Sequence, residues 1–507
     1  MMIRWISRQS LRIWIPLSVV TSAVILISTQ ASGCAGGSST TTEQAPLADR
    51  QWLAGDSHIH SHWSPGYDRD VEVPTIIKGA DAIYSTPHNA AMAEQYGLSW
   101  MVTTDHGGPN HSKYNADEAY PELERSRDSV SGVLQFYGME LNMPGMDHHT
   151  LIIPQTDDER TMLLQIENKF DKNDIWPVDP DRDTEMARVN ALTYMKDLEH
   201  LPLLFANHPS RSATDLGEYG YDEPWELRAN NTLAPMVYRG MEGAPGHQAA
   251  SLTLSTEPSQ YSFTTSPRAR GYYQNEKAPT LGGFDQMTAI VGGMWDSLLG
   301  EGRRFWIVAS SDSHVHYTEL SRPGVDFWPG EFHKTYVHAQ KNYVDVLDGL
   351  RSGRIFAVAG DLISALNLTV TGENGTSMAG ETLEISSGDD IAIKIQLVDP
   401  DTLNHNQDNP SVNRIDLIVG EVRGFSGDEN SDTNETTRVL ERFTSSTWVR
   451  EGESITIRTT LPKIETDMYV RVRGTSGNDL EPSMDIPGED PWSDLWFYSN
   501  PVFVQVD

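Results

Sequence analysis

Short apolar runs, each ending in histidines and acidic residues, recur through the first two thirds of this sequence. The run "LSWMVTT" leads into Asp105 and His106, "LPLLFANHPS" spans residues 201–210, and "RRFWIVASSDSHVH" spans residues 303–316. Such runs between amphipathic stretches are typical of an α/β fold. Barrel-type α/β enzymes build their sites from polar residues at the carboxyl ends of strands. The pattern therefore predicts an α/β fold from about residue 50 to 360, with a site at the strand ends.

The segment "GDSHIHSHWSPGYD" (residues 55–68) places His58, His60 and His62 at alternate positions. Side chains alternate faces along an extended strand, so the three imidazoles would share one face. Neutral imidazole is the commonest protein ligand for transition metals. A solvated histidine-rich edge explains this stretch equally well, so other parts of the chain must decide.

The pattern changes after about residue 365. Polar and apolar residues alternate in the segments 365–372, 391–399, 414–422, 454–461 and 468–474, separated by Gly-, Asp- and Asn-rich turns. This alternation predicts an antiparallel β-sandwich. We therefore divide the chain into a signal segment (1–34), a flexible linker (35–50), an α/β domain (51–362) and a β-sandwich domain (363–507).

The first 34 residues have the composition of an export signal. Arg4, Arg8 and Arg12 precede an apolar core at residues 13–28. The stretch "ASGC" ends at Cys34, the only cysteine, and resembles the lipobox of bacterial lipoproteins. We expect export to the bacterial cell envelope (periplasm or outer membrane) with a lipid anchor at Cys34. A plain secretory signal or an uncleaved anchor is the alternative.

The composition limits the partners and the chemistry. The chain has 38 basic and 72 acidic residues, a net charge of −34, so we expect no nucleic-acid partner. The small-molecule ester substrate that we expect instead follows from the motifs and the resemblance described below. Membrane contact would come only through lipidated Cys34. Because no cysteine follows residue 34, thiolate nucleophiles and thiolate metal ligands are excluded from the folded part. The oligomeric state is left open.

The polar residues at the strand ends form one ordered series. In chain order it comprises His58, His60, Asp105, His106, Glu140, His148 or His149, His208, Asp312 and His314. Mixed imidazole and carboxylate ligands suit Zn²⁺, Mn²⁺ or Fe²⁺, and carboxylates can bridge two ions. The series predicts a site for divalent transition-metal ions, and their number, two or three, is what the resemblance described next implies.

This series (HxH, TDH, E, H, NHP and DxH) resembles the PHP (polymerase and histidinol phosphatase) domain of metal-dependent phosphoesterases. Residues 295–314 ("WDSLLGEGRRFWIVASSDSH") and 334–360 are similar to segments of its carbaryl-hydrolase-like branch. The resemblance covers roughly residues 52–360 and, more loosely, the sandwich. It implies a distorted (βα)7 barrel with metal ions at the strand ends.

Carried over by position, the resemblance also implies which side chains bind which ion. His58 and His60 would bind the first metal with Glu140 and Asp312, with Glu140 bridging. His106 and His314 would bind the second metal, and Glu140, His149 and His208 a third. We prefer His149 to His148 because it immediately precedes the apolar "TLII" run, as the histidine of the family does. Asp105 would orient His106 or bind metal itself.

One motif departs from the family. This chain has "SPG" at residues 64–66 where the family usually has "SDG", and Pro65 offers no ligand. His62 or Asp68 is expected to replace the missing aspartate, unless the second ion is held less tightly.

These features together predict a metal-dependent hydrolase in which a hydroxide between the metal ions attacks phosphorus or an acyl carbon. A phosphoester is the preferred substrate class, and a carbamate or carboxylic ester is the alternative. A third hypothesis is a non-catalytic surface binding lipoprotein. Arg211, and less so Lys334, would assist an anionic substrate, while Glu242, His247 and His316 rank below the main ligands.

Overall fold

The computed structural model describes residues 49–68, 70–246, 280–319, 321–322, 324, 326–485 and 490–507. Residues Leu47–Asp507 form one compact unit. The predicted signal segment, Cys34 and nearly all of the predicted linker lie outside the described residues. Among the helices that the structure describes, none has the length and apolar character needed to cross a bilayer.

The chain up to residue 360 alternates strands and helices. Its strands are β1 (Gln51–Ile59), β2 (Gly66–Asp68), β3 (Thr75–Ile77), β4 (Trp100–Thr103), β5 (Leu134–Asn142), β6 (His148–Ile152), β7 (Leu203–Ala206), β8 (Tyr238–Pro245), β9 (Trp306–Ser310), β10 (His333–Ala339) and β11 (Ile355–Ala359). Its helices are α1 (Thr86–Gln95), α2 (His111–Tyr114), α3 (Tyr120–Ser129), α4 (Glu159–Phe170), α5 (Glu185–Lys196), α6 (Pro224–Leu233), α7 (Gln286–Ala289), α8 (Met294–Gly300) and α9 (Tyr343–Ser352), with a π-helical turn at Asn115–Ala119 and a 3₁₀ turn at Pro180–Arg182.

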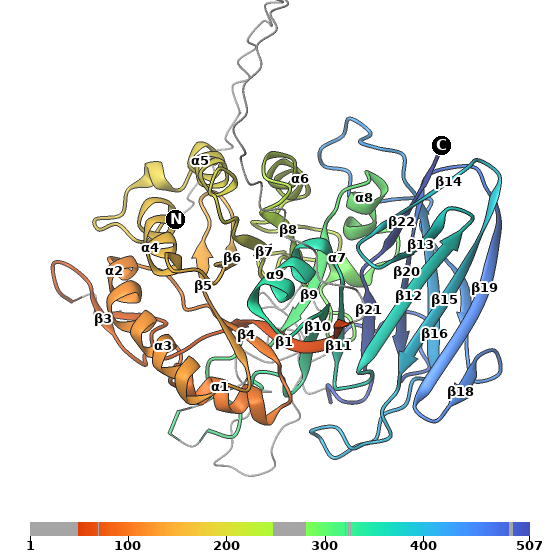
Figure 1. Cartoon of the computed structure of the whole chain (residues 1–507). Coiled ribbons are helices and arrows are strands. Elements are labelled where there is room, and N and C mark those ends of the chain that lie inside the picture. Colours follow the sequence, from red (N-terminus) through yellow and green to blue (C-terminus); the bar gives the residue numbers. More distant parts are fainter. Residues whose placement is uncertain are drawn as a thin grey trace, which may run out of the picture. The chain divides into compact units, whose positions relative to one another are not determined.

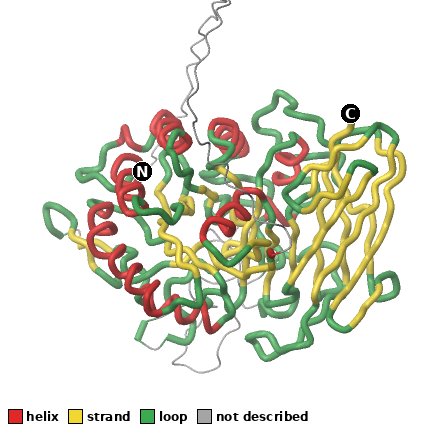
Figure 2. The backbone as a smooth tube through the Cα atoms, in the orientation of Figure 1, coloured by secondary structure: helices red, strands yellow, loops and turns green. Residues whose placement is uncertain are grey.

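The described residues after 360 form strands and no helices (Figure 2). The strands are β12 (Ala365–Gly372), β13 (Gly375–Met378), β14 (Thr382–Ile385), β15 (Asp389–Val398), β16 (Arg414–Glu421), β17 (Arg438–Phe443), β18 (Val449–Glu451), β19 (Ser454–Ile464), β20 (Met468–Thr475), β21 (Trp496–Ser499) and β22 (Val502–Val506). The five segments predicted as strands from alternation match β12, β15, β16, β19 and β20.

The strands form one large mixed sheet and separate antiparallel sheets (Figure 1). The large sheet follows the order β14-β22-β20-β21-β11-β10-β1-β4-β5-β6-β7-β8-β9, with β16 and β17 attached through β20. A second sheet has the order β13-β12-β15-β19-β18. Backbone pairing between Ile59 and Ser313 brings the end of β1 next to the segment after β9. The fold is therefore mixed α/β, and the distorted (βα)7 barrel with a sandwich stays the finer interpretation of these sheets.

Strand β6 runs antiparallel to both of its neighbours, β5 and β7. Only residues 143–147 connect β5 to β6. A parallel crossover needs a dozen or more residues, so a connection this short forces a hairpin. The first residue of β6 therefore lies at the same edge of the sheet as the last residues of β5.

Local sequence signals explain where the helices begin and end. The Ser85 side chain accepts a hydrogen bond from the His88 amide at the start of α1, and Pro87 occupies its first turn. Helix α9 starts in the same way at Asn342 and ends at Gly353, whose φ of 80° is the left-handed conformation that glycine adopts readily. Figure 1 shows α1 to α6 on the outer side of strands β4 to β8.

A close contact fixes β1 against β4. A Cβ atom on Gly55 would lie 1.9 Å from the indole ring of Trp100, so only glycine fits at this position. Trp100 is fully buried, and its indole N–H donates to the Leu53 carbonyl. Gly55 thus allows β4 to pack closely beside the strand that carries His58.

The two halves of the chain share one sheet and one core. Strand β21 pairs antiparallel with β11, and a single cluster of buried apolar side chains extends from Trp100 through Phe356 to Val504. The predicted boundary at residues 362/363 is not tested by these contacts and stays a prediction.

A buried ion pair joins α8 to β20. The Arg471 guanidinium donates to both oxygens of Asp296, over 2.9 and 2.7 Å, and the Tyr469 hydroxyl donates to one of them. Both charged side chains are almost fully buried. Removing one partner of such a pair leaves an uncompensated buried charge.

We expect Asp296→Asn to lower the free energy of unfolding by about 3–5 kcal/mol, measured by urea denaturation. The matched control is Glu421→Gln, which removes the carboxylate from an exposed pair with Arg423 and is expected to cost less than about 1 kcal/mol. Equal effects of the two substitutions would contradict the role assigned to the buried pair.

Candidate metal centre

The candidate site lies at one edge of the large sheet, where several strands end. Strand β1 carries His58, β4 leads to His106, β5 carries Glu140, β7 leads to His208, and β9 leads to Asp312. Backbone pairing between His106 and Glu140 joins two of these strand ends directly. Three groups of described side chains place ligand atoms within 4.8 Å of one another and could each hold a metal ion.

The first group consists of His58, His60 and Asp312. Nδ1 of His58 lies 2.7 Å from a Glu242 oxygen, and because a carboxylate only accepts, this nitrogen carries the proton. Nδ1 of His60 lies 3.0 Å from the Ser64 hydroxyl, which itself donates to Asp81, so His60 Nδ1 also donates. In the neutral rings the proton-free nitrogen is therefore Nε2.

These two Nε2 atoms lie only 2.9 Å apart, and Asp312 Oδ1 lies 3.3 and 3.2 Å from them. Three buried electron-pair donors meeting at one point repel one another unless a metal ion or a shared proton lies between them. Imidazole nitrogen and carboxylate oxygen are the donors that divalent transition metals prefer. The residues present therefore fit a metal ion.

The second group consists of His60, Asp81, His106 and His314. His314 Nδ1 donates to the backbone carbonyl of Asp312 over 2.9 Å, which leaves Nε2 facing Asp81 at 3.3 Å. No sequence signal identifies Asp81. It lies between β3 and α1, four residues past the end of the short strand β3, and no motif or periodicity marks it.

Asp81, and neither His62 nor Asp68, is the carboxylate residue that the structure places in this second group. His62 follows the end of β1 and pairs instead with Glu122, with 3.1 Å between Nε2 and a carboxylate oxygen. Asp68 accepts a hydrogen bond from the Asp70 amide in the turn after β2. The alternation of side-chain directions along β1 does not continue to His62, because the strand ends at Ile59. His62 therefore does not share the face of His58 and His60.

The third group consists of His106, Glu140 and His148. Glu140 Oε1 lies 3.1 Å from His148 Nδ1 and 3.0 Å from His208 Nε2, and Oε2 lies 2.8 Å from His106 Nδ1. Burial alone would raise the pKa of Glu140, but the neighbouring imidazoles of His106, His148 and His58 hold it well below the usual value. Glu140 is thus an ionised carboxylate in contact with imidazoles from four strand ends.

The preference for His149 over His148 is corrected by this arrangement. Successive side chains of β6 point to opposite faces, so His148 faces Glu140 while His149 points away from it. His149 is fully buried, its Nε2 lies 2.9 Å from the Tyr238 hydroxyl, and burial lowers its pKa to about 3. The apolar run that follows His149 indicates a strand, but it does not indicate which face of the strand lies toward the site.

Asp105 also has a different role from the one predicted. Its two carboxylate oxygens accept hydrogen bonds from the amide and the hydroxyl of Ser61, and it belongs to none of the candidate groups in the described chain. Asp105 therefore fixes the turn that follows His60 and neither orients the His106 ring nor joins a metal group.

The structure describes four of the five remaining candidates. Glu242 is fully buried and supports residues of the site. Besides its contact with His58, its carboxylate accepts hydrogen bonds from the Ser310 hydroxyl and the His208 amide, both over 2.6 Å. Lys334 pairs with Asp361, and His316 with Glu331. His247 lies outside the described residues. Arg211, by contrast, lies near the site, with its guanidinium paired to Asp147 next to His148.

Two of the site residues hold an uncommon backbone conformation. His208 has a φ of 31° and Asp312 a φ of 47°, both in the left-handed region that non-glycine residues rarely adopt. Backbone conformations of this kind cost about 1–3 kcal/mol each and gather at functional sites. Both residues lie just past a strand end, where the chain turns and aims their side chains at Glu140 and His58.

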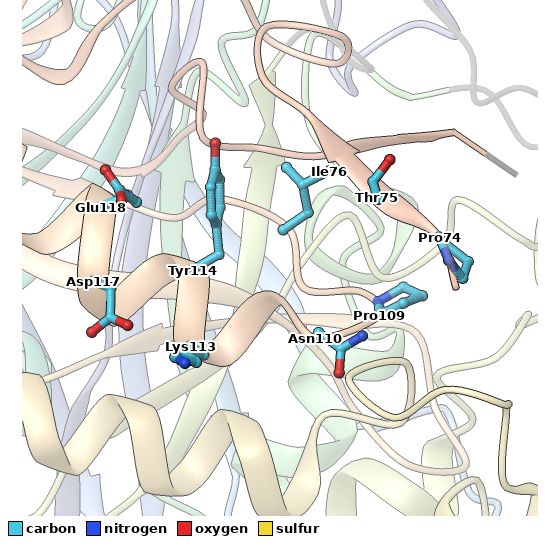
Figure 3. A pocket seen from close by; sticks show the side chains of 9 residues that line it. All are labelled: Pro74, Thr75, Ile76, Pro109, Asn110, Lys113, Tyr114, Asp117 and Glu118. Atoms are coloured by element: carbon cyan, nitrogen blue, oxygen red, sulfur yellow. The ribbon is translucent and has the colours of Figure 1, made fainter. Parts of the chain in front are cut away.

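A cavity of about 390 Å³ lies beside the loop that follows His106 (Figure 3). Its lining residues come from β3, from that loop and from α2 with the π-helical turn: Pro74, Thr75, Ile76, Pro109, Asn110, Lys113, Tyr114, Asp117 and Glu118. The volume falls within the range of small-molecule sites, about 300–1,000 Å³. Asn110 has a φ of 58°, and its amide donates to the Asp174 carbonyl over 2.7 Å.

Comparison of the sequence with family models gives no match, and comparison with curated proteins gives none. Among solved structures, the chain is similar to endonuclease Q in complex with a 27-mer duplex substrate that has an abasic lesion at the active site. The two are 14% identical with a TM-score of 0.29, and the match covers 60% of this chain and 56% of that chain. A likeness this remote carries no argument about what the present chain binds.

The predicted partners nevertheless need a correction. We expected a small-molecule ester and excluded nucleic acid because of the net charge of −34, whereas the similar structure holds a duplex substrate, a likeness too remote to assign a partner to this chain. Net charge describes the whole chain and does not determine the local potential at one site. The exclusion of nucleic acid is therefore withdrawn.

A measurement of metal binding distinguishes the roles of His148 and His149, the two adjacent histidines of β6. We expect His148→Ala to weaken the binding of Mn²⁺ or Zn²⁺ by at least about tenfold, since even partners behind the ligands typically contribute 10–100-fold. His149→Ala should leave metal binding nearly unchanged and destabilise the fold by about 1–3 kcal/mol, because the Tyr238 hydroxyl loses its partner. Elemental analysis and urea unfolding measure the two effects, and the reverse pattern would contradict this placement.

The first residue of α2 yields a pH-dependent prediction. His111 Nδ1 lies 2.6 Å from Glu167, and although burial opposes protonation, Glu167 raises the pKa of His111 to about 9. Because this value exceeds the ordinary 6.5, protonated His111 stabilises the fold fully below pH 6.5, and this contribution is lost as the pH rises through 9. This contribution of protonated His111 to the free energy of unfolding is on the order of 3 kcal/mol.

We therefore expect the stability difference between the wild type and His111→Gln to shrink between pH 6.5 and pH 9. Urea unfolding of both proteins across this range measures it, and other titrating groups cancel in the difference. A difference that does not change with pH would rule out a charged His111.

Proposed function

We propose that this chain is a metal-dependent hydrolase of the PHP type, and that it cleaves phosphoesters. The observation that carries the proposal is the meeting of His58 Nε2, His60 Nε2 and Asp312 Oδ1 at one buried point, beside a carboxylate that touches imidazoles from four strand ends. Imidazole nitrogens and a carboxylate oxygen that converge in this way are the donor set that divalent transition metals prefer. The resemblance to the carbaryl-hydrolase-like branch belongs to this proposal and rests on sequence motifs alone.

Each residue of the centre has a defined task in this proposal. His58, His60 and Asp312 would hold one ion, Asp81, His106 and His314 a second, and Glu140 with His148 a third, with His208 facing Glu140. Divalent ions held there would supply Lewis acidity and a nucleophile from water near neutral pH. Glu242 keeps the proton of His58 on Nδ1, and Ser64 does the same for His60, so both Nε2 lone pairs remain directed into the centre.

Arg211 is the cation that we assign to substrate binding. Its guanidinium lies against Asp147, one residue before His148, and its backbone amide donates to the His208 carbonyl. A planar guanidinium suits the oxygens of a phosphoryl group, and it stays charged at all relevant pH values. Arg211 would therefore bind a non-bridging oxygen and stabilise its charge as the ester bond breaks.

Hydrolysis of a carbamate or carboxylic ester is the alternative, because the same centre would activate water toward an acyl carbon. Export with a lipid anchor at Cys34 is part of the proposal as well. It is supported by the charged and apolar pattern of the first 34 residues and by the position of the only cysteine.

A substrate panel tests the proposal. Purified protein with Mn²⁺ or Zn²⁺ is assayed on p-nitrophenyl phosphate, bis-p-nitrophenyl phosphate, 1-naphthyl acetate, a naphthyl carbamate and a labelled duplex oligonucleotide. We expect turnover of a phosphoester, and a loss of about 100-fold or more in kcat for Asp312→Asn.

The control is Glu122→Gln, an isosteric change at a buried carboxylate that contacts His62 outside the three groups; it should keep the activity. Turnover of only the acyl substrates would replace the phosphoesterase assignment by the alternative. Bound metal without turnover of any substrate would favour the non-catalytic binding protein.

A further inference from the structure

The segment between β20 and β21 belongs to the strand-rich C-terminal half, yet its side chains connect, through intervening residues, to both strand-end loops that carry His208 and His314. These two loops leave β7 and β9, more than a hundred residues apart in sequence. Two side chains of the segment, Asp485 and Trp492, begin two separate chains of contacts toward the candidate metal centre.

The first chain starts with an apolar contact. The Trp492 ring packs edge-on against Phe327 and Phe332, with centroid distances of 5.8 and 4.8 Å. Phe327 follows Asp326, whose carboxylate accepts hydrogen bonds from the backbone amides of His314 (2.7 Å) and Val315 (2.8 Å). Because these amides belong to the loop that carries His314, the position of Trp492 bears on the direction of that imidazole.

The second chain consists of hydrogen bonds. The Asp485 carboxylate accepts from the Thr280 hydroxyl and from the amides of Gly282 and Gly283 over 2.6–2.9 Å. The next turn holds Asp285, which accepts from both the hydroxyl (2.8 Å) and the amide (3.0 Å) of Ser210. Ser210 follows His208 by two residues.

Several features of the second chain restrict its movement. Gly282 has a φ of 56°, and a Cβ atom there would lie 2.6 Å from the Trp496 ring. Phe284 packs against Tyr498 of β21 with 4.4 Å between ring centroids. Asp285 and Ser210 are fully buried. The turn at residues 280–285 therefore contacts the C-terminal half through Asp485 and Tyr498. It also contacts the His208 loop through the bonds between Asp285 and Ser210.

We propose that Asp485 and Trp492 are positioning residues for the metal centre, and that this is a function of the C-terminal half. Each side chain acts on a different ligand loop: Asp485 on the loop of His208, and Trp492 on the loop of His314. Outer partners that orient metal ligands typically contribute 10–100-fold to metal affinity. The part of this inference that concerns metal affinity rests on the proposed function, whereas the part that concerns loop order does not.

Hydrogen–deuterium exchange of the full-length, metal-free protein tests the loop order directly. We expect Trp492→Ala to speed amide exchange in residues 311–317 and Asp485→Ala to speed it in residues 207–213, each with little effect on the other loop. The matched controls are Trp448→Ala and Asp467→Ala; Trp448 packs on the same core, and Asp467 accepts from the Val506 amide in the same half. Both controls should leave the two loops unchanged.

Metal titration gives the second measurement. Trp492→Ala and Asp485→Ala should each weaken Mn²⁺ or Zn²⁺ binding by about tenfold, and Trp492→Phe and Asp485→Asn should restore part of it. If an alanine variant does not fold, metal binding and amide exchange are measured on the conservative variant of the same residue instead.

Unchanged exchange in both loops, or faster exchange spread evenly over the whole chain, would overturn the proposal and leave a general stabilising role. Faster exchange confined to the expected loops, without any metal binding, would uphold the positioning of the loops and refute the proposed hydrolase.

Discussion

The arrangement of this protein depends on buried donor atoms that lie close together and repel one another unless a metal ion or a shared proton lies between them. His58 and His60 each have one ring nitrogen occupied by an outside partner, Glu242 or Ser64, and this leaves two lone pairs 2.9 Å apart beside the Asp312 carboxylate. Burial increases their mutual repulsion because little solvent screens it. Bound divalent ions turn this repulsion into attraction, and the same reasoning extends through Glu140 to the other imidazoles.

The sheet supplies the geometry that this arrangement needs. Parallel strands bring their carboxyl ends to one edge, and the short connection before β6 adds His148 at that edge from the opposite direction. The left-handed conformations of His208 and Asp312 turn both side chains toward the centre. The C-terminal half completes the support, because it shares a sheet with the rest through β11 and β21 and reaches the loops of His208 and His314.

Much of this could be predicted from the sequence, since it depends on local pattern. Alternation identified β12, β15, β16, β19 and β20, and the polar ends of apolar runs identified His58, His60, His106, Glu140, His208, Asp312 and His314 as neighbours in space. Asp81 could not be predicted, because it reaches the centre from a segment with no periodic pattern. His149 was chosen over His148 because a flanking apolar run marks a strand without marking its face. The connection through Asp485 and Trp492 depends on tertiary contacts between distant segments, which no local pattern encodes.

Anomalous X-ray diffraction from crystals grown with Mn²⁺ shows directly whether these side chains surround cations. We expect strong anomalous peaks within bonding distance of His58, His60 and Asp312 and of Asp81, His106 and His314, with Glu140 beside them. Crystals that show ordered imidazoles in the same positions, but no anomalous peak among them at saturating Mn²⁺, would contradict this expectation.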